Sequence, residues 1–243
     1  MDLTEFAAFV VKKFGVHNIN PLSSHFRSTE DAYLDELRTA VAKADSHIVG
    51  LGLSGGHFYD VDKSRRQAAV DYGRKWIDIA VKIQSPSVRQ HVSGQKGTKP
   101  DVALAAESLG QLAEYGSKHN IIVNLENDNP VAENPFFLVD VIQRVNSPYL
   151  RALPDFGNSL QGQNQEYNER AVKAMFKYAY GMAHVKDTIT DEDKIYTVNL
   201  KNMFAIAKDS GYKGYFSMEY DTSSGDPVQG TQKLVQESLM YLA

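Results

Sequence analysis

Apolar, strand-like runs alternate with amphipathic helical stretches along the whole chain. Two successive examples are the run 121–126 followed by a helix over 135–145, and the run 149–155 followed by a helix over 168–179. This alternation predicts a parallel sheet whose strands are joined by right-handed helical crossovers. The length of 243 residues is close to the ~250 that a (β/α)8 barrel typically takes. We therefore predict an α/β fold of the (β/α)8 TIM type.

The predicted barrel lacks its first strand. The pattern gives seven strands and eight helices, and it begins with a helix over 3–14 where such a barrel begins with a strand. One explanation, which we prefer, is that about 25 residues, the size of one βα unit, precede this helix in the full-length protein. The other is an open seam between the last strand and the strand over 17–25. Strand edges at a seam need a cover, and this is one reason to expect a homo-oligomer.

Composition narrows the classes of protein to which the chain can belong. No linker, low-complexity tract or charge block suggests a second domain, so we expect one domain over 1–243. The net charge of −4 provides no long-range attraction for nucleic acid or an anionic membrane. The chain has no cysteine, which excludes disulfides and thiolate metal ligands. Without an apolar stretch of ~20 residues or a basic leader, we expect a cytoplasmic protein with neither nucleic-acid nor membrane partners.

Four of the predicted strands end at a side chain that can bind a metal ion: Glu126, Asp155, His184 and Glu219. The gaps between them are 155 − 126 = 29, 184 − 155 = 29 and 219 − 184 = 35 residues, about one βα unit each. The four side chains should therefore meet at one rim of the barrel. Each alone has a simpler explanation, as a rim carboxylate, a turn cap at Asp155, or a packed histidine at His184.

Three carboxylates and one imidazole form a ligand set for a single divalent cation. One nitrogen and three oxygen-donor residues favour Mn²⁺, Mg²⁺ or Co²⁺, while Zn²⁺ is also compatible with the set. We therefore predict one bound divalent metal ion as the cofactor.

Further polar side chains lie near the ends of the earlier predicted strands. His25 closes the strand over 17–25, and His57 lies in the glycine-rich loop that follows the next strand. Arg89 and His91 lie in the strand over 87–94. An arginine there can hold a phosphate or carboxylate through two hydrogen bonds. The alternative, which the position inside the strand slightly favours, is an ion pair with a neighbouring carboxylate inside the barrel. We expect these four residues to contact the substrate.

The segments NLEND, PDFGNS, HVKD and SMEYD resemble the strand-end signatures of the sugar phosphate isomerase/epimerase family, the xylose-isomerase-like TIM barrels. The resemblance covers most of the chain. It implies that Glu126, Asp155, His184 and Glu219 are the metal ligands, and that Glu126 and Glu219 also flank the substrate as the proton-transferring pair. It further implies a small-molecule substrate, namely a sugar, keto-sugar, sugar phosphate or similar polyol.

The chemistry of such a reaction explains the residue types. An isomerase or epimerase of this kind removes a proton next to a carbonyl, and a divalent metal stabilises the enediolate that forms. A carboxylate on each face of the enediolate can remove a proton and return one. We therefore expect a metal-dependent sugar isomerase or epimerase.

Two positions qualify the resemblance. Asn158 stands three residues after Asp155, where related epimerases often have a histidine. Its amide can donate a hydrogen bond to a substrate oxygen but cannot carry a proton. Lys186 matches the HxKD pattern of many relatives and either neutralises a substrate oxyanion or pairs with Asp187.

Three alternative functions remain open at this point. A dehydratase of inosose-type ketones would form the same enolate and then expel a β-hydroxyl. An apurinic-site endonuclease would need more rim histidines for a three-metal cluster, and a barrel that has lost catalysis would hold no stoichiometric ion. The chain has no GxSxG, HExxH or GxGxxG motif.

Overall fold

The computed structural model describes residues 1–191, 194–221 and 225–242. The chain divides into two compact units. The first consists of Met1–Leu125 with Asp140–Arg151, and the second of Glu126–Val139 with Ala152–Ala243. Helix α5 (Pro135–Val145) and strand β6 (Leu150–Leu153) contribute residues to both units.

The first unit alternates helices with short parallel strands. Its helices are α1 (Leu3–Phe14), η1 (Ser23–His25, a 3₁₀ turn), α2 (Asp31–Lys43), α3 (Lys63–Lys82) and α4 (Val102–His119). Its strands are β1 (Asn18–Ile19), β2 (His47–Ile48), β3 (Leu51–Gly52), β4 (Ser87–Gln90) and β5 (Ile122–Glu126), whose last residue belongs to the second unit.

Local sequence signals determine where these helices begin and end. Asp2 accepts a hydrogen bond from the backbone N–H of Thr4 at the start of α1, and Gly15 ends the helix with a φ of 65°. Asp101 accepts from two backbone N–H groups at the start of α4, at 2.8 and 2.9 Å. Side-chain oxygens at such positions satisfy amide groups that have no partner inside the helix.

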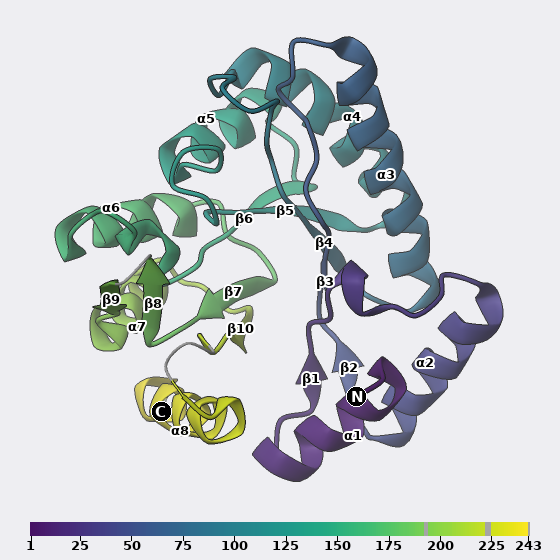
Figure 1. The fold of residues 1–243 in the computed structure, drawn as a ribbon, viewed down its shortest axis with the longest axis vertical. Helices are drawn as coiled ribbons and strands as arrows, with labels where there is room; N and C mark the ends of the chain where they lie inside the picture. The colour runs from purple at the N-terminus through teal and green to yellow at the C-terminus, as the bar shows by residue number, and fades with distance from the viewer. Residues whose placement is uncertain (192–193, 222–224, 243) are drawn as a thin grey trace. The chain divides into compact units, whose positions relative to one another are not determined.

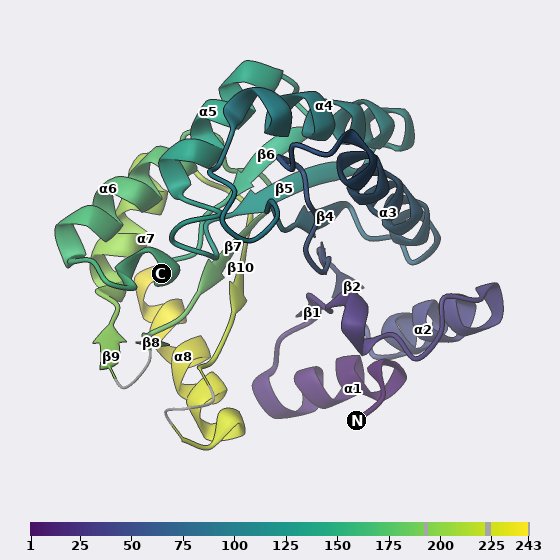
Figure 2. The ribbon, with the colours of Figure 1, turned by 45° about the horizontal axis from the view of Figure 1, so that its top comes forward.

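Parallel pairing orders the strands of the first unit. β1 pairs with β2, and β3, β4, β5 and β6 follow one another in a second sheet. Figure 1 shows α3 and α4 packed side by side along this sheet, and Figure 2 shows α1 and α2 together beside β1 and β2. Every residue of β4 is buried, as expected for a parallel strand covered on both faces.

The second unit continues the same alternation. After η2 (Asn158–Leu160, a 3₁₀ turn), its elements are α6 (Gln165–Phe176), β7 (Met182–Val185), β8 (Thr188–Asp191), β9 (Lys194–Thr197), α7 (Leu200–Asp209), β10 (Tyr215–Met218) and α8 (Pro227–Leu242). Strands β7 and β10 are parallel, with His184 opposite Ser217. Asp155 forms a parallel bridge with His184, so the end of the chain segment after β6 lies beside β7, which pairs in turn with β10.

An aromatic core lies beneath these strand ends. The ring of Phe156, which is fully buried, has its centroid 5.1 Å from that of Phe204 and 6.0 Å from that of Phe216. Both contacts are edge-to-face, the arrangement that aromatic quadrupoles favour. The residue after Asp155 is therefore held in a rigid apolar core.

The predicted TIM-type fold is confirmed, and the elements of the described residues differ from the prediction in three places. The strand expected over 47–55 is divided into β2 and β3, which pair in different sheets. The strand expected over 17–25 is regular only at Asn18–Ile19, because Pro21 has no N–H to donate; after an isolated bridge between Leu22 and Gly52 the chain turns into η1. The antiparallel pairing of β8 with β9 was not predicted, although β-branched residues in both strands favour extended structure. None of the described helices combines the length and hydrophobicity that crossing a bilayer requires.

Candidate metal centre

The four predicted ligands come together in the second unit. Glu126 ends β5, Asp155 follows β6, His184 lies in β7 and Glu219 follows β10. Each offers one ligand atom, and these four atoms all lie within 4.8 Å of one another. The spacing of about one βα unit between successive ligand candidates thus produced the convergence that the sequence predicts.

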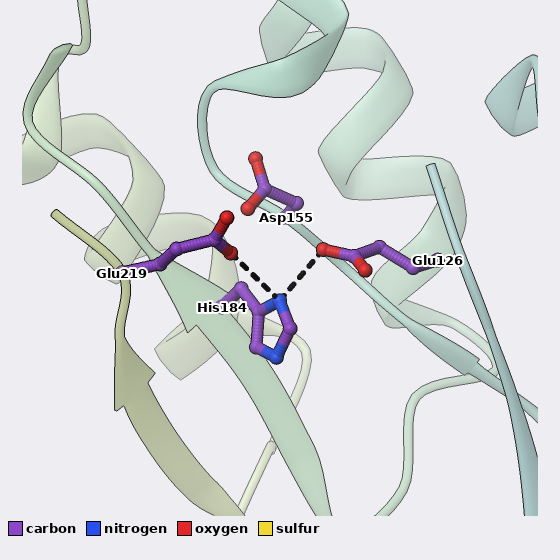
Figure 3. Close-up of side chains that lie close together, drawn as sticks. All are labelled: Glu126, Asp155, His184 and Glu219. Carbon is purple, nitrogen blue, oxygen red and sulfur yellow. Dashed lines mark hydrogen bonds and ion pairs between the residues drawn. The ribbon is translucent and has the colours of Figure 1, made fainter. Parts of the chain in front are cut away.

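His184 lies between the two glutamates. Its Nδ1 is 2.6 Å from Oε1 of Glu126 and 3.2 Å from Oε2 of Glu219. Figure 3 shows the two carboxylates meeting at the same ring nitrogen, with Glu219 to its left, Glu126 to its right and Asp155 beside them. The side chain of Glu126 is buried, whereas that of Glu219 is 51% exposed. Only one of the two glutamates is therefore open to solvent.

Asp155 uses its two carboxylate oxygens differently. Oδ1 accepts hydrogen bonds from the backbone N–H groups of Gly157 and Asn158, at 2.8 and 2.7 Å. Oδ2 is buried, receives no hydrogen bond from the described residues, and lies 3.3 Å from Nζ of Lys186. Asp155 is therefore both the turn cap and the ligand candidate that the sequence offered as alternatives.

Lys186 brings a buried positive charge to the cluster. Its Nζ lies 3.3 Å from Oε1 of Glu219, as close as it lies to Asp155, and donates to Oδ1 of Asn158 at 2.9 Å. The pairing with Asp187 considered from the sequence does not occur, because the Lys186 side chain points to the strand ends. The amide of Asn158 also donates to Oδ1 of Asp128 at 3.2 Å.

The mutual attraction of these charges shifts their pKa values. Complete burial raises the pKa of Asp155 to about 6, against the attraction of Lys186. Burial alone would lower the pKa of His184, but the carboxylates of Glu126 and Glu219 outweigh it and raise that pKa to about 10. Burial opposes ionisation of Glu219, yet hydrogen bonds from His184 and attraction to Lys186 bring its pKa below the ordinary value. Three carboxylates gathered this closely require positive charge among them.

The residues fit one divalent cation. A buried carboxylate oxygen without a hydrogen bond, at Asp155 Oδ2, is an orphan acceptor that a cation would satisfy. Three oxygen donors and one imidazole form a set suited to a hard or borderline divalent ion rather than a thiophilic one. All four donors lie close enough to share a single ion.

The comparison with known proteins decides the family. The family model described as xylose isomerase-like TIM barrel matches residues 10–243, nearly the whole chain. The chain belongs to the xylose isomerase-like TIM barrel family. No curated protein sequence matches it.

Solved structures share the fold of this xylose isomerase-like barrel. D-psicose 3-epimerase from Clostridium cellulolyticum H10, solved with D-tagatose, matches with a TM-score of 0.76 and 15% identity over 100% of this chain and 92% of that one. A xylose isomerase-like TIM barrel protein from Mycobacterium smegmatis, in complex with magnesium, matches with a TM-score of 0.75 and 17% identity over 99% of this chain and 89% of that one. A 3-keto-D-glucoside 4-epimerase from E. coli matches with a TM-score of 0.68 and 14% identity over 86% of this chain and 85% of that one.

The remaining predicted site residues of this xylose isomerase-like chain lie in its first unit. His25 ends η1, where its Nδ1 accepts from the backbone of Leu22 at 3.4 Å. His57 is half exposed, with Nδ1 3.6 Å from a carboxylate oxygen of Asp60. The guanidinium of Arg89, in β4, contacts the imidazole of His91 just beyond that strand. Their roles toward a substrate stay predictions.

Sequence reasoning missed the polar residues that support the centre. Asn127 is buried directly after Glu126, Ser159 is buried in η2, and Asp128 holds Asn158. The run of polar residues after the apolar strand, ENDN, is a signal for a polar strand end, but it does not indicate which partner each side chain meets.

Proposed function

We propose that this protein is a divalent-metal-dependent epimerase or isomerase of sugars or keto-sugars, with phosphorylated sugars included in the substrate class. The observation that carries the proposal is the pair of carboxylates, Glu126 and Glu219, that meet at Nδ1 of His184 beside Asp155. The structural neighbours that act on D-psicose and on a 3-keto-D-glucoside support it. Membership of the xylose isomerase-like family supports it further.

Glu126, Asp155, His184 and Glu219 would hold the metal ion, with Mn²⁺, Mg²⁺ or Co²⁺ preferred and Zn²⁺ compatible. A divalent ion supplies the positive charge that stabilises an enediolate. The neighbour solved in complex with magnesium supports a divalent ion on this fold.

The two glutamates would move the proton. One carboxylate removes the proton from the carbon next to the carbonyl, and the other returns a proton to the opposite face of the planar intermediate. This sequence inverts the configuration at that carbon, which is epimerisation. If a single carboxylate returns the proton to the neighbouring carbon, the result is isomerisation. The lowered pKa of Glu219 keeps its carboxylate ionised near neutral pH.

Lys186 would contribute a fixed charge beside the reacting atoms. Its ammonium lies 3.3 Å from both Asp155 and Glu219, and a developing oxyanion at the centre would be attracted to it. We further propose that Asn158 and the first-unit residues His25, His57, Arg89 and His91 orient the sugar hydroxyls or phosphate.

The test is deuterium exchange with a panel of ketoses. The purified protein, loaded with Mn²⁺, is incubated in D₂O with D-fructose, D-psicose or D-tagatose, and the products are followed by NMR and mass spectrometry. Incorporation of deuterium next to the carbonyl, with an epimer or isomer as product, supports the proposal. Loss of water from the substrate would indicate a dehydratase instead. If the protein shows no deuterium exchange and no turnover with either free or phosphorylated ketoses, proton-transfer catalysis is refuted.

Two variants identify the acids responsible. Glu219→Gln and Glu126→Gln should each lower kcat by about 10²–10⁴-fold, the usual contribution of a general acid or base. Glu166→Gln is the matched control, because Glu166 is an exposed residue at the start of α6. Unchanged deuterium exchange in Glu219→Gln would contradict the assigned role.

A further inference from the structure

Asn127 lies between two of the candidate ligands and touches both of their strands. It follows Glu126 directly in the chain, and its side chain is 2% exposed. Its Oδ1 accepts a hydrogen bond from the backbone N–H of Asp155 at 2.8 Å, and its Nδ2 donates to the carbonyl oxygen of Asp155 at 3.2 Å. Both backbone polar groups of Asp155 are therefore held by one side chain.

A primary amide has the same donor and acceptor as a peptide group. Strand β5 ends at Glu126 and β6 ends at Leu153, so the regular elements stop before Asp155. The Asn127 amide takes the place of the next peptide group and extends the hydrogen-bonding to Asp155. Glu126 and Asp155, which are 29 residues apart in the chain, are thereby fixed in register.

A third hydrogen bond fixes the orientation of this amide. Nδ2 of Asn127 also donates to Oγ of Ser159 at 2.9 Å. Nδ2 therefore donates two hydrogen bonds. Rotating the amide by 180° would place its oxygen against the carbonyl oxygen of Asp155, where two acceptors would face each other without a donor.

The backbone around Asp155 is also held from the side of His184. The N–H of His184 donates to the carbonyl of Pro154 at 2.9 Å, and the N–H of Phe156 donates to the carbonyl of His184 at 3.1 Å. Asn127 on one side and β7 on the other therefore place Asp155 between Glu126 and His184. Displacing Asp155 would misplace one ligand relative to two others.

We propose that Asn127 is a positioning residue whose side-chain amide, oriented by Ser159, fixes the carboxylate of Asp155 for metal binding. The inference rests on the proposed metal centre. Mutating a residue that hydrogen-bonds to a metal ligand and orients it typically lowers metal affinity about 10- to 100-fold. The loss of affinity should therefore be measurable by metal binding alone, without an assay of turnover.

The experiment measures Mn²⁺ affinity by titration calorimetry and the melting temperature of the metal-free protein. Asn127→Ala should weaken Mn²⁺ binding by about 10- to 100-fold. Ser159→Ala should weaken it less, because the two bonds to Asp155 remain. The double variant should bind no more weakly than Asn127→Ala alone, because Ser159 acts through the amide.

The matched control is Asn134→Ala. Asn134 is also an asparagine of the second unit; its Nδ2 donates to Oη of Tyr167 at 3.0 Å, and its Oδ1 accepts from the backbone N–H of Phe136 at 3.1 Å. This variant should lower the melting temperature while leaving the Mn²⁺ dissociation constant within about twofold of wild type, since its side chain bonds to none of the peptide groups around the candidate ligands.

The outcomes separate the inference from the proposed function. Wild-type protein that binds no Mn²⁺ would refute the metal centre itself. If the wild type binds Mn²⁺ and Asn127→Ala binds it with the same affinity, with only its melting temperature lowered, the positioning role is overturned. If Asn127→Ala does not fold, Ser159→Ala decides: weaker Mn²⁺ binding supports the inference, and unchanged binding overturns it.

Discussion

Among single residues, Lys186 most affects the electrostatics of the centre. Its ammonium is buried and lies 3.3 Å from the carboxylates of Asp155 and Glu219. Without a metal ion it offsets the repulsion among the carboxylates, and with one it adds a second positive charge nearby. The same side chain should therefore stabilise the metal-free protein and weaken metal binding.

Lys186→Met tests these opposite effects. Removing one partner of a buried ion pair should lower the unfolding free energy of the metal-free protein by about 3–5 kcal/mol. Mn²⁺ should bind more tightly to this variant, because a like charge near the ion is gone. Urea unfolding in EDTA and titration calorimetry measure the two quantities.

Lys233→Met is the control for that experiment. Its Nζ lies 4.0 Å from Asp187, and its side chain is 73% exposed. Exposed pairs contribute only about 0–1 kcal/mol, so this variant should resemble wild type in both measurements. Weaker Mn²⁺ binding by Lys186→Met would contradict the electrostatic account.

At the scale of elements, helix α4 contains two glycines in different surroundings. A Cβ added at Gly116 would lie 2.4 Å from the carbonyl oxygen of Ile121, which is backbone and cannot move aside easily. The turn from α4 into β5 passes at that point, with the N–H of Ile121 bonded to the carbonyl of Gly116 at 2.9 Å. A Cβ at Gly110 would meet only Val145, at 4.0 Å.

The same substitution at the two positions should therefore have opposite effects. Gly116→Ala should lower the unfolding free energy by about 1–3 kcal/mol, the usual cost of forcing extra atoms into a packed site. Gly110→Ala should raise it by about 0.5–1 kcal/mol, because alanine favours the helix. Chemical denaturation of both variants measures the difference, and equal effects would contradict the close approach at Ile121.

At the scale of the whole molecule, a bound metal ion should stabilise the folded chain. An ion that binds only the folded state adds about 2.7 kcal/mol when its concentration is 100 times the dissociation constant. For a chain of this size each kcal/mol raises the melting temperature by about 2–4 °C, so Mn²⁺ should raise it by about 5–11 °C.

Differential scanning calorimetry with Mn²⁺ or EDTA measures this shift. Glu126→Gln removes a buried candidate ligand and should lose most of the increase, whereas Glu166→Gln should keep it. An equal increase in Glu126→Gln would mean that the ion binds elsewhere.

The single domain over 1–243, a homo-oligomeric state and a cytoplasmic location stay predictions.

The alternation of elements and the four candidate ligands can be predicted from local sequence patterns alone. Apolar periodicity and capping residues such as Asp101 act over a few neighbours, so most helices lie within a few residues of their predicted bounds. Glu126, Asp155, His184 and Glu219 could be predicted because each ends a strand at the same phase of the βα repeat. Their convergence follows from that phase without knowledge of any side-chain contact.

The pairing of the polar residues around these ligands, in contrast, depends on the folded arrangement of the strands. Lys186 meets Asp155 and Glu219 rather than its chain neighbour Asp187, and the Asn127 amide reaches across to Asp155. These partners lie about 28 to 33 residues apart in the chain. Which of them meet depends on which strand ends lie side by side and where each side chain points there. Local sequence patterns carry no information about that geometry, because it arises only when the strands pair.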